Sequence, residues 1–480
     1  MNHSMITYVL GTVLKLTGLF LLIPVLCSLI YREQEGLPFL TVGVLSFAIG
    51  TLLSIRKPED TAFFLREGCV TTALSWILLS VTGCIPFVAT GEIPSFLDAL
   101  FETVSGFTTT GASILADVEA LSHTALLWRS FTHWIGGMGV LVFLLAVIPL
   151  TGGGTINLMR AESPGPSVGK LVPKIRYTAR ILYGIYLFLT VLLLVLLILF
   201  GMPFFDAVCT ALGTAGTGGF GIRGDSMAGY SPALQWIVTV FMILFGVNFN
   251  TFYFLLLRDI KKALSLEEVR AYFALIVCAT VMITVNIAAS FHSLADAIRA
   301  AAFQVGSIIT TTGFSTADFD QWPPLSQGIL ILLMFIGACA GSTGGGIKVS
   351  RILFLGKSTH HQVFTYLHPK SIRPIKMDGH TIDEETHQGI HAYFAAYLLI
   401  FALSVLPLLA QGCDLVTGFT AVAATFNNIG PGLAAVGPMQ NFGGLHALSK
   451  CVLIFDMLAG RLELFPLLVL FSPNLWKELR

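Results

Sequence analysis

Long apolar runs separated by short polar segments dominate this chain. Ten of these runs are long enough, at about 20 residues each, to cross a bilayer as a helix. They lie near residues 8–30, 38–55, 69–90, 128–150, 180–202, 233–257, 271–291, 327–355, 391–411 and 446–471. The pattern predicts an all-α integral membrane protein that crosses the membrane many times.

Four shorter stretches lie between pairs of consecutive runs. Each is too short to span a bilayer, too polar, and rich in Gly and Thr. Non-helical backbone is tolerated at membrane depth only where protein or water covers it. We therefore interpret these stretches as re-entrant segments, in which a short helix and a loop enter and leave on one side. They cover residues 96–115, 204–222, 294–319 and 415–434.

The four stretches align on one another, which indicates an internal repeat. The first and third end in Thr-Thr-Thr-Gly, at Gly111 and Gly313, the second contains Gly216-Thr-Gly218, and the fourth contains Asn428-Ile-Gly430. We predict two N-terminal helices followed by four pseudo-repeats of helix, pore loop and helix around one central pore. The predicted boundaries are 1–68 for the N-terminal extension and 69–160, 161–260, 261–358 and 359–480 for the four repeats.

Four Gly-containing loops suit the passage of a dehydrated cation. A ring of backbone carbonyls can replace the hydration shell of K⁺. Glycine adopts the required backbone angles at little steric cost, and Thr hydroxyls can add oxygen atoms. The C-terminal end of each short helix carries partial negative charge, which favours a cation. Asp98 and Asp206 begin the first two short helices, and we interpret them as N-terminal caps rather than ion ligands.

Composition and charge agree with a membrane location. The chain is 55% hydrophobic and 11% charged, whereas about a quarter of the residues in soluble domains are charged. Lys and Arg gather in the connections opposite the short segments, which the positive-inside rule makes cytoplasmic together with both termini. The start of the chain lacks a cleavable signal pattern and is interpreted as a membrane helix. The eight cysteines contain no CxxC pair and are interpreted as packing residues.

Two features interrupt the predicted helices. Gly341-Ser-Thr-Gly-Gly-Gly346 lies inside the eighth run, and each Gly costs a helix about 1 kcal/mol relative to Ala. The helix should therefore break at membrane depth, just before Lys348. Arg461 lies inside the last run between Asp456 and Glu463. It could form a barrier in an ion path, or it could pair with one of these acids and lock two helices together.

The polar residues outside the repeat have mostly structural interpretations. Six of the eleven histidines lie between residues 360 and 391, and we interpret them as a solvated cytoplasmic face. His387 and His391 have the spacing of metal ligands, so a membrane enzyme that uses this loop with acids 378, 383, 384 and 385 is a remote alternative. Arg129 and His133, close to Glu102, are predicted to brace the first loop. The chain has no GxGxxG nucleotide motif.

Several longer motifs place the chain in a known superfamily. They are Trp128-Arg-Ser-Phe-Thr-His-Trp-Ile-Gly-Gly-Met-Gly139, Ala161-Glu-Ser-Pro-Gly-Pro166, Gly341-Ser-Thr-Gly-Gly-Gly-Ile-Lys348, His368-Pro369, Asn427-Asn-Ile-Gly-Pro-Gly432 and Gly460-Arg-Leu-Glu463. With the four loops, they resemble the Trk/Ktr/HKT superfamily of K⁺ transport proteins over nearly the whole chain. The two extra N-terminal helices fit the TrkH/TrkG-type subunit better than the Ktr type.

The resemblance implies potassium uptake through a carbonyl-lined selectivity filter. Gly111 favours K⁺, because family members that pass Na⁺ often have Ser there. The fourth loop has Asn-Ile in place of Thr-Thr, so discrimination should be less stringent than in a symmetric K⁺ channel, and a Na⁺-permeable member is the alternative. The implied K⁺-binding residues are Thr109, Thr110, Gly111, Gly216, Thr217, Gly218, Thr311, Thr312, Gly313, Asn428, Ile429 and Gly430.

The resemblance also implies a gate, partners and a location. A Gly-rich intramembrane loop and an Arg barrier would lie beneath the filter. A homodimer in the cell (inner) membrane would dock on TrkA-like cytosolic nucleotide-binding regulatory subunits, with no enzyme activity, cofactor or nucleic acid and with K⁺ as the transported ion. Channel conduction and symport with H⁺ or Na⁺ both remain open. The implied gating residues are Gly341, Ser342, Thr343, Gly344, Gly345, Gly346, Lys348 and Arg461.

Overall fold

The computed structural model describes residues 1–56, 58, 64–139, 175–370 and 373–473. The predicted all-α fold is confirmed, since the described part is helical apart from a short hairpin of β1 (Lys376–Met377) and β2 (His380–Thr381). Residues 140–174 include the end of the fourth predicted span, the boundary at 160/161 and the motif at 161–166. These predictions lie outside the described residues.

The N-terminal extension consists of α1 (His3–Phe20), α2 (Leu22–Tyr31) and α3 (Gly36–Leu53). Helices α1 and α3 pack closely because glycines face each other at two levels. A Cβ atom on Gly18 would lie 2.6 Å from the carbonyl oxygen of Gly43, and one on Gly50 would lie 2.5 Å from that of Gly11. Small residues thus let the two backbones touch, as is common between membrane helices.

The remaining helices follow the predicted repeat. The first two units contain α4 (Leu65–Thr90), α5 (Phe96–Phe107), α6 (His123–Met138), α9 (Ile175–Leu199), α10 (Phe204–Ala215), α11 (Pro232–Phe245) and α12 (Phe249–Leu256). The short helix α13 (Ile260–Ser265) begins at the boundary, and the last two units contain α14 (Glu267–Ile287), α15 (Leu294–Ile309), α16 (Pro324–Ile336), α17 (Val349–Leu367), α18 (Glu384–Ala410), α19 (Leu415–Phe426), α20 (Ala447–Arg461) and α21 (Phe465–Leu470). Three single 3₁₀ turns, η1 (Ala288–Ser290), η2 (Phe319–Gln321) and η3 (Ala434–Val436), lie in the connections. Each predicted re-entrant stretch is a short helix, namely α5, α10, α15 or α19, followed by a loop.

Three of the predicted spans are broken. Six described helices, or seven if one bent pair is counted as a span, are long and apolar enough to cross a membrane. The break between α16 and α17 was predicted. The predicted continuous helix at 233–257 is wrong, because α11 and α12 meet at 92° and Asn248 caps α12. The predicted helix at 446–471 is also interrupted, because Glu463 and Leu464 have left-handed backbone angles.

The structure corrects the prediction that Asp98 and Asp206 cap the first two short helices. The side chain of Ser95, not Asp98, accepts the capping hydrogen bond of α5. Asp98 lies in the first turn and pairs with Lys450 at 2.6 Å. Asp206 accepts from Arg223 at 3.1 Å, beyond the end of α10. Both acids therefore connect a short helix to a later segment, although their position in the first turn still suits the helix dipole.

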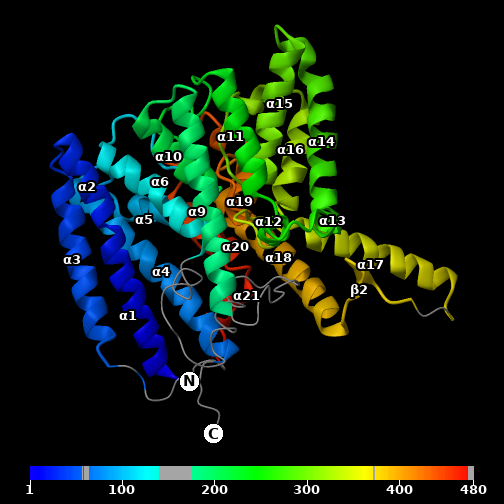
Figure 1. Ribbon diagram of the computed structural model, residues 1–480, viewed down its shortest axis with the longest axis horizontal. Helices are drawn as coiled ribbons and strands as arrows, with labels where there is room; N and C mark the ends of the chain where they lie inside the picture. Colours follow the sequence, from blue (N-terminus) through cyan, green and yellow to red (C-terminus); the bar gives the residue numbers. More distant parts are fainter. Residues whose placement is uncertain (57, 59–63, 140–174, 371–372, 474–480) are drawn as a thin grey trace.

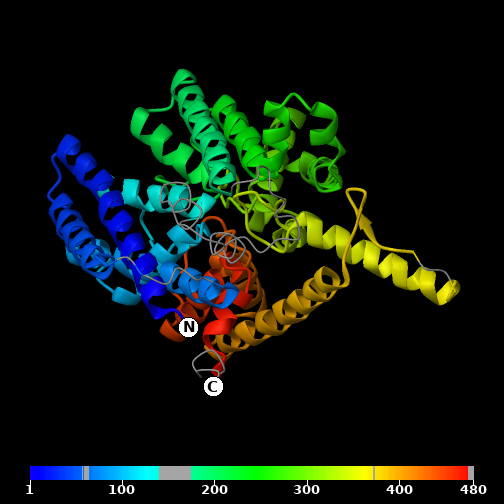
Figure 2. The same cartoon turned by 60° about the horizontal axis from the view of Figure 1, so that its bottom comes forward.

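Apolar side chains surround the outside of the bundle as well as filling its inside. Leu29 on α2, Leu199 on α9, Val285 on α14 and Leu399 on α18 are all exposed. The three largest buried clusters of the described residues lie within, and each joins neighbouring repeats, as when Ile429 of the fourth repeat packs among residues of the third. Such a surface suits lipid, so the chain is a multi-pass membrane protein. Helix α17 projects away from the bundle, and α18 returns beside its base (Figures 1 and 2).

Candidate functional site

The four short helices end in the same turn. The residues in the left-handed region are Thr109 (φ 56°), Thr217 (φ 52°), Thr311 (φ 58°) and Asn428 (φ 55°). The next residue in each loop donates its N–H to a carbonyl five residues earlier, as Thr110 does to Ser105 at 2.9 Å and Ile429 to Ala424 at 2.8 Å. This is the Schellman pattern, which normally has Gly where three threonines occur here. A β-branched residue at positive φ is strained, and such strain concentrates at functional sites.

The four loops close into a ring. A Cβ atom on Gly111 would lie 2.1 Å from the carbonyl oxygen of Gly218, and one on Gly219 would lie 1.9 Å from that of Thr312. A Cβ on Gly313 would lie 2.0 Å from the carbonyl oxygen of Ile429, and one on Gly430 would lie 2.8 Å from that of Thr110. Each loop therefore touches the next, the fourth touches the first, and only Gly fits at these contacts.

In the structure, the second loop is aligned with the other three one residue later than the sequence alignment predicted. Gly219, with φ 79°, is the structural equivalent of Gly111, Gly313 and Gly430, which have φ values of 80°, 86° and 99°. The prediction placed Gly218 in that role. In the structure Gly218 instead lies one step earlier and presents its carbonyl oxygen to Gly111. The Gly-Gly pair made both alignments possible from sequence alone, and the backbone angles distinguish them.

The hydroxyl groups of the ring alternate around it. Thr108 and Thr110 share a hydrogen bond of 2.8 Å between hydroxyls in the first loop. The third loop, which lies opposite, has the same bond of 2.7 Å between Thr310 and Thr312. The second loop has glycines at these positions, and the fourth loop has Asn427-Asn-Ile. In the fourth loop, Asn428 donates through Nδ2 to the Thr110 hydroxyl at 2.9 Å. The imperfect symmetry expected from sequence is thus a pairwise alternation.

A buried polar brace supports the first loop, as predicted, and it also reaches the second loop. Arg129 donates through Nε to Glu102 at 2.8 Å and lies over the Phe220 ring. The Phe220 N–H donates to Nε2 of His133 at 3.3 Å, and Nδ1 of His133 lies 2.8 Å from the carbonyl oxygen of Gly106. Because Nε2 accepts, Nδ1 must carry the proton and donate to Gly106. A neutral His133 therefore connects the first short helix to the second loop.

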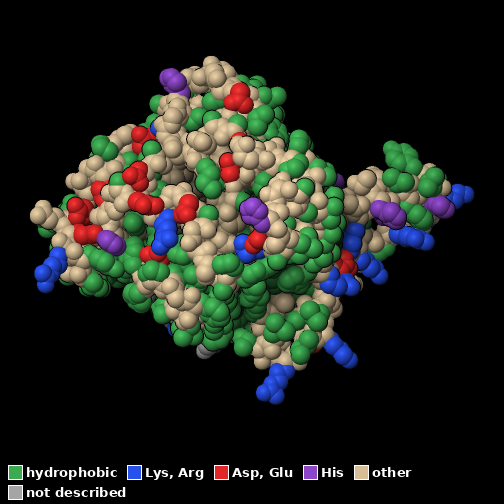
Figure 3. All heavy atoms as spheres, turned by 90° about the horizontal axis from the view of Figure 1, so that it is seen from above, with side chains coloured by type: hydrophobic (Ala, Val, Ile, Leu, Met, Phe, Trp, Pro, Cys, Tyr) green, Lys and Arg blue, Asp and Glu red, His purple; other side chains and the backbone are tan. Residues whose placement is uncertain are grey.

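A cavity of about 140 Å³ opens beyond the ring on the side where the short helices begin. Its lining includes the four ring glycines, Arg129 and Arg223. Acidic side chains gather on this face, which Figure 3 shows from above. The connections there contain acids such as Glu92, Asp117 and Asp320. Their field raises the local concentration of cations at the mouth of the cavity.

The Gly-rich loop between α16 and α17 lies against the other end of the ring. Gly345 donates its N–H to the Thr311 hydroxyl at 2.6 Å. A Cβ atom on Gly345 would lie 2.4 Å from the carbonyl oxygen of Asn427, and one on Gly344 would lie 2.8 Å from that of Thr310. The loop therefore packs on the third and fourth turns with no room for side chains. A cavity of about 80 Å³, lined by Trp76, Lys348 and Arg461 among others, lies beside it.

Arg461 connects this loop to α6. It donates to the carbonyl oxygen of Thr343 at 2.9 Å and to that of Gly137 at 2.8 Å, and it also contacts the carbonyl of Gly136. The neighbouring acids have other partners. Glu463 pairs with Arg351, and Asp456 accepts from Ser404 at 2.7 Å. Arg461 thus holds the loop to the end of α6, and Lys348 contacts the carbonyl of Gly344 within the loop.

Glu268 is a site residue that the sequence did not single out. One of its oxygens, Oε1, accepts from the N–H of Ala340 at 2.6 Å and from that of Ser350 at 3.0 Å. This buried carboxylate therefore holds the Gly-rich loop to the first turn of α17. The bend between α11 and α12 adds a further tie, since Phe249 donates to the Gly341 carbonyl at 3.0 Å. Glu268 follows Glu267 at the edge of an apolar run, where acids are usually solvated.

The histidine and cysteine side chains bring no metal site together in the described ranges. His387 and His391 lie 3.2 Å apart through their Nε2 atoms, and both contact the Ser358 hydroxyl. No group of three or more His, Cys, Asp or Glu residues within the described part of the chain could hold a metal ion. All eight cysteines are free.

Comparison with known proteins places this architecture in a family. Residues 36–478 match the family described as "TrkH: Cation transport protein". The Trk system potassium uptake protein TrkH of Salmonella typhimurium is 37% identical over the whole of both chains. The Trk system potassium uptake protein TrkG of Escherichia coli is 33% identical, also over the whole of both chains. The relatives are named as transport proteins, which leaves the membrane-enzyme alternative without support.

A solved structure has the same fold. The crystal structure of the potassium transporter TrkH from Vibrio parahaemolyticus superposes with a TM-score of 0.90 at 34% identity, covering 99% of this chain and 100% of that one. The matched region therefore takes in nearly the full length of both chains. The chain therefore belongs to the TrkH family of cation transport proteins.

Proposed function

We propose that this protein takes up K⁺ across the cell (inner) membrane through the ring of four loops, each ring being formed within one chain. The observation that carries the proposal is the closed contact of four equivalent turns whose carbonyls meet at glycines. Full-length relatives at 37% identity are named as potassium uptake proteins. On this proposal, the units that follow residue 68 are four pore repeats, with the boundaries predicted from sequence.

Backbone oxygens would replace the water around the ion. Glycines at the contacts let neighbouring loops approach until carbonyls face a shared axis, and the dipole of each short helix adds negative potential there. K⁺ would be the only metal ion held, and no cofactor would take part. The proposed filter consists of Thr109, Thr110, Gly111, Gly216, Thr217, Gly218, Gly219, Thr311, Thr312, Gly313, Asn428, Ile429 and Gly430.

Selectivity is the first test. Purified protein in proteoliposomes should conduct K⁺ and Rb⁺ in preference to Na⁺ and Li⁺, with discrimination limited by the alternating composition of the ring. Equal Na⁺ and K⁺ flux would favour the alternative of a poorly selective cation channel. The same vesicles with an imposed pH or Na⁺ gradient distinguish a channel from symport, because only a coupled carrier moves K⁺ against its own electrochemical gradient.

The Gly-rich loop and Arg461 would close the pore beneath the filter. The loop packs directly on the Thr311 and Asn427 turns, so it blocks the path sterically. Arg461 adds a positive charge next to that path and holds the loop to α6. Opening would require the loop to leave these contacts. Residues 341–346, Lys348 and Arg461 are therefore proposed as the gate.

The regulated assembly follows from the same family. We propose a homodimer whose Lys- and Arg-rich connections and termini face the cytoplasm and dock on TrkA-like nucleotide-binding subunits, because this chain has no nucleotide motif of its own. The relatives are named as parts of a Trk system. Light scattering of the purified protein should give the mass of two copies, and labelling of engineered cysteines from one side should locate the termini. A monomer, or termini labelled from outside, would contradict this arrangement.

A further inference from the structure

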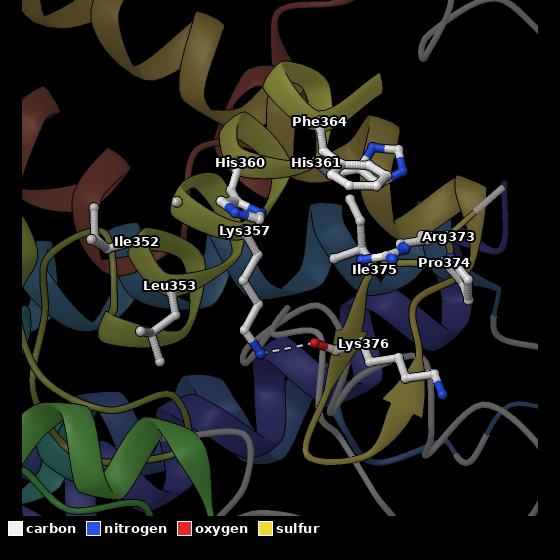
Figure 4. A pocket seen from close by; sticks show the side chains of 11 residues that line it. Ile352, Leu353, Lys357, His360, His361, Phe364, Arg373, Pro374, Ile375 and Lys376 are labelled. Carbon is white, nitrogen blue, oxygen red and sulfur yellow. Dashed lines mark hydrogen bonds between the residues drawn. The ribbon is translucent and has the colours of Figure 1, made fainter. Parts of the chain in front are cut away.

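A further cavity lies outside the pore, between the projecting α17 and the hairpin. Its volume is about 490 Å³, and Figure 4 shows the side chains that line it. The walls are largely apolar and include Ile352, Leu353 and Phe364 from α17 and Ile375 from the segment before β1. A cavity with apolar walls of this size can accept part of an amphiphilic molecule.

Basic side chains surround these apolar walls. Lys357, His360 and His361 come from α17, while Arg373 and Lys376 come from the hairpin side. No Asp or Glu belongs to the lining that the structure describes. Basic and histidine side chains are also prominent on the projecting arm in Figure 3. The cavity therefore combines an apolar interior with a cationic rim, which complements an anion attached to an apolar group.

The position of α17 favours a membrane lipid as that molecule. The helix leaves the bundle directly from the Gly-rich loop and projects sideways from it, at the level of α13 (Figure 1). Near its end the helix also exposes Val363, Tyr366 and Leu367, at 55%, 87% and 71% of their surfaces. Helices with basic and apolar faces bind at the membrane surface, where basic clusters attract anionic headgroups. A phospholipid offers both a phosphate for the rim and acyl carbon for the walls.

We propose that this cavity binds the anionic headgroup of a membrane phospholipid and that its occupancy biases the Gly-rich loop. The second part rests on the proposed gate. Lys357 pairs with Glu267. It also donates to the Lys376 carbonyl at 2.8 Å, as Figure 4 shows. Glu267 in turn donates its N–H to Asp378 at 2.7 Å. The hairpin, the cavity and the first turn of α14 thus meet at one basic side chain.

The next residue along α14 completes the route to the gate. Glu268 holds both Ala340 in the Gly-rich loop and Ser350 at the start of α17. A phosphate that attracts Lys357 competes with Glu267 for the same ammonium group. Loss of that ion pair loosens the first turn of α14, and with it the carboxylate that positions the loop. Glu268 is therefore a positioning residue between the cavity and the gate.

Lipid binding is tested without any ion flux. Native mass spectrometry of the purified full chain with phosphatidylglycerol should show a retained lipid, and Arg373→Gln with Lys376→Gln should weaken retention about fivefold for each charge removed. Lys370→Gln, which removes a charge from the same arm outside the cavity, should retain lipid like the parent. Equal retention by all variants, or equal loss in the Lys370 control, would overturn the site. Retention of inorganic phosphate alone in the cavity, in place of the phospholipid, would overturn a lipid as the ligand.

The link to the gate is tested in vesicles of phosphatidylcholine with or without phosphatidylglycerol. The anionic lipid should change the K⁺ flux of the parent and of Lys370→Gln alike, by severalfold. Arg373→Gln with Lys376→Gln should abolish that change, and the flux of this variant in phosphatidylcholine alone should match the parent. An unaltered lipid response in the cavity variants would refute the coupling. Cysteine crosslinking between α17 helices of two copies through the cavity would show that a second chain fills it instead, which also overturns the proposal. Because retention of lipid is measured separately, failure of the proposed pore would leave the binding result intact.

Discussion

Replacing Arg461 by Ala should open the pore, by an amount that follows from its contacts. A hydrogen bond of 2.9 Å to the Thr343 carbonyl joins this side chain to the Gly-rich loop. A hydrogen bond to a charged group contributes about 1.5–3 kcal/mol. If the bond is lost on opening, its removal shifts the balance between closed and open loop by about tenfold to a hundredfold. K⁺ flux into proteoliposomes should rise by a similar factor until the loop is open most of the time.

The conservative variant separates charge from geometry. Arg461→Lys keeps the positive charge but cannot reach both the loop and α6 with one planar group. Flux that rises in Arg461→Lys as much as in Arg461→Ala assigns the effect to the lost tie, whereas a rise in Arg461→Ala alone assigns it to the charge. Arg299→Ala, which removes a surface ion pair with Asp296, is the matched control and should conduct like the parent. Parent-like flux in folded Arg461→Ala protein would refute the gating role.

Three further changes test other parts of the molecule. Gly219→Ala should lower K⁺ flux about tenfold or more, because its Cβ would lie 1.9 Å from the Thr312 carbonyl oxygen. The control Gly224→Ala, whose Cβ would meet only Glu119 at 3.9 Å, should leave the flux unchanged. Equal effects of the two changes would contradict the assignment of Gly219 to the ring. Glu268→Gln should raise K⁺ flux about tenfold, because it weakens the two charge-assisted hydrogen bonds that hold the Gly-rich loop to α17. The control Glu385→Gln, on the exposed start of α18, should leave the flux unchanged. Unchanged flux in Glu268→Gln would show that Glu268 does not hold the loop closed. Burial raises the pKa of Glu33, but hydrogen bonds from Thr124 and His123 outweigh it and lower the pKa below its ordinary value. The ionised carboxylate therefore stabilises the fold at any pH above its ordinary pKa. This stabilisation is lost as the pH falls through the lowered pKa. Glu33→Gln should therefore lower the melting temperature at neutral pH but not in acid, and a pH-independent difference would contradict the assignment.

The repeat could be predicted from sequence because its signal is local. Apolar runs, short Gly- and Thr-rich stretches and the four-glycine run each reveal themselves within about twenty residues. The short helices α5, α10, α15 and α19 and the break before α17 were found in this way. The sharp bend at Asn248 was missed, because a continuous apolar run hides a break that depends on hydrogen bonds to the Gly-rich loop far along the chain.

The finer parts of the site depended on long-range contacts. Gly218 and Gly219 are alike in sequence, and only the carbonyls of neighbouring loops assign them different roles. Glu268 acts through backbone groups of residues 340 and 350, about seventy to eighty positions away, so spacing contained no sign of it. Asp98 was expected to cap a helix, yet Lys450, from the last repeat, draws it into an ion pair.

A ring contributed wholly by one polypeptide changes how damage to the protein would spread. In a channel built from four separate chains, one faulty copy spoils every assembly that contains it. Here the closed contact from Gly111 round to Gly430 lies within a single chain. In a population that mixes intact and defective copies, transport should decline only in proportion to the defective share, and a defective allele should behave as recessive.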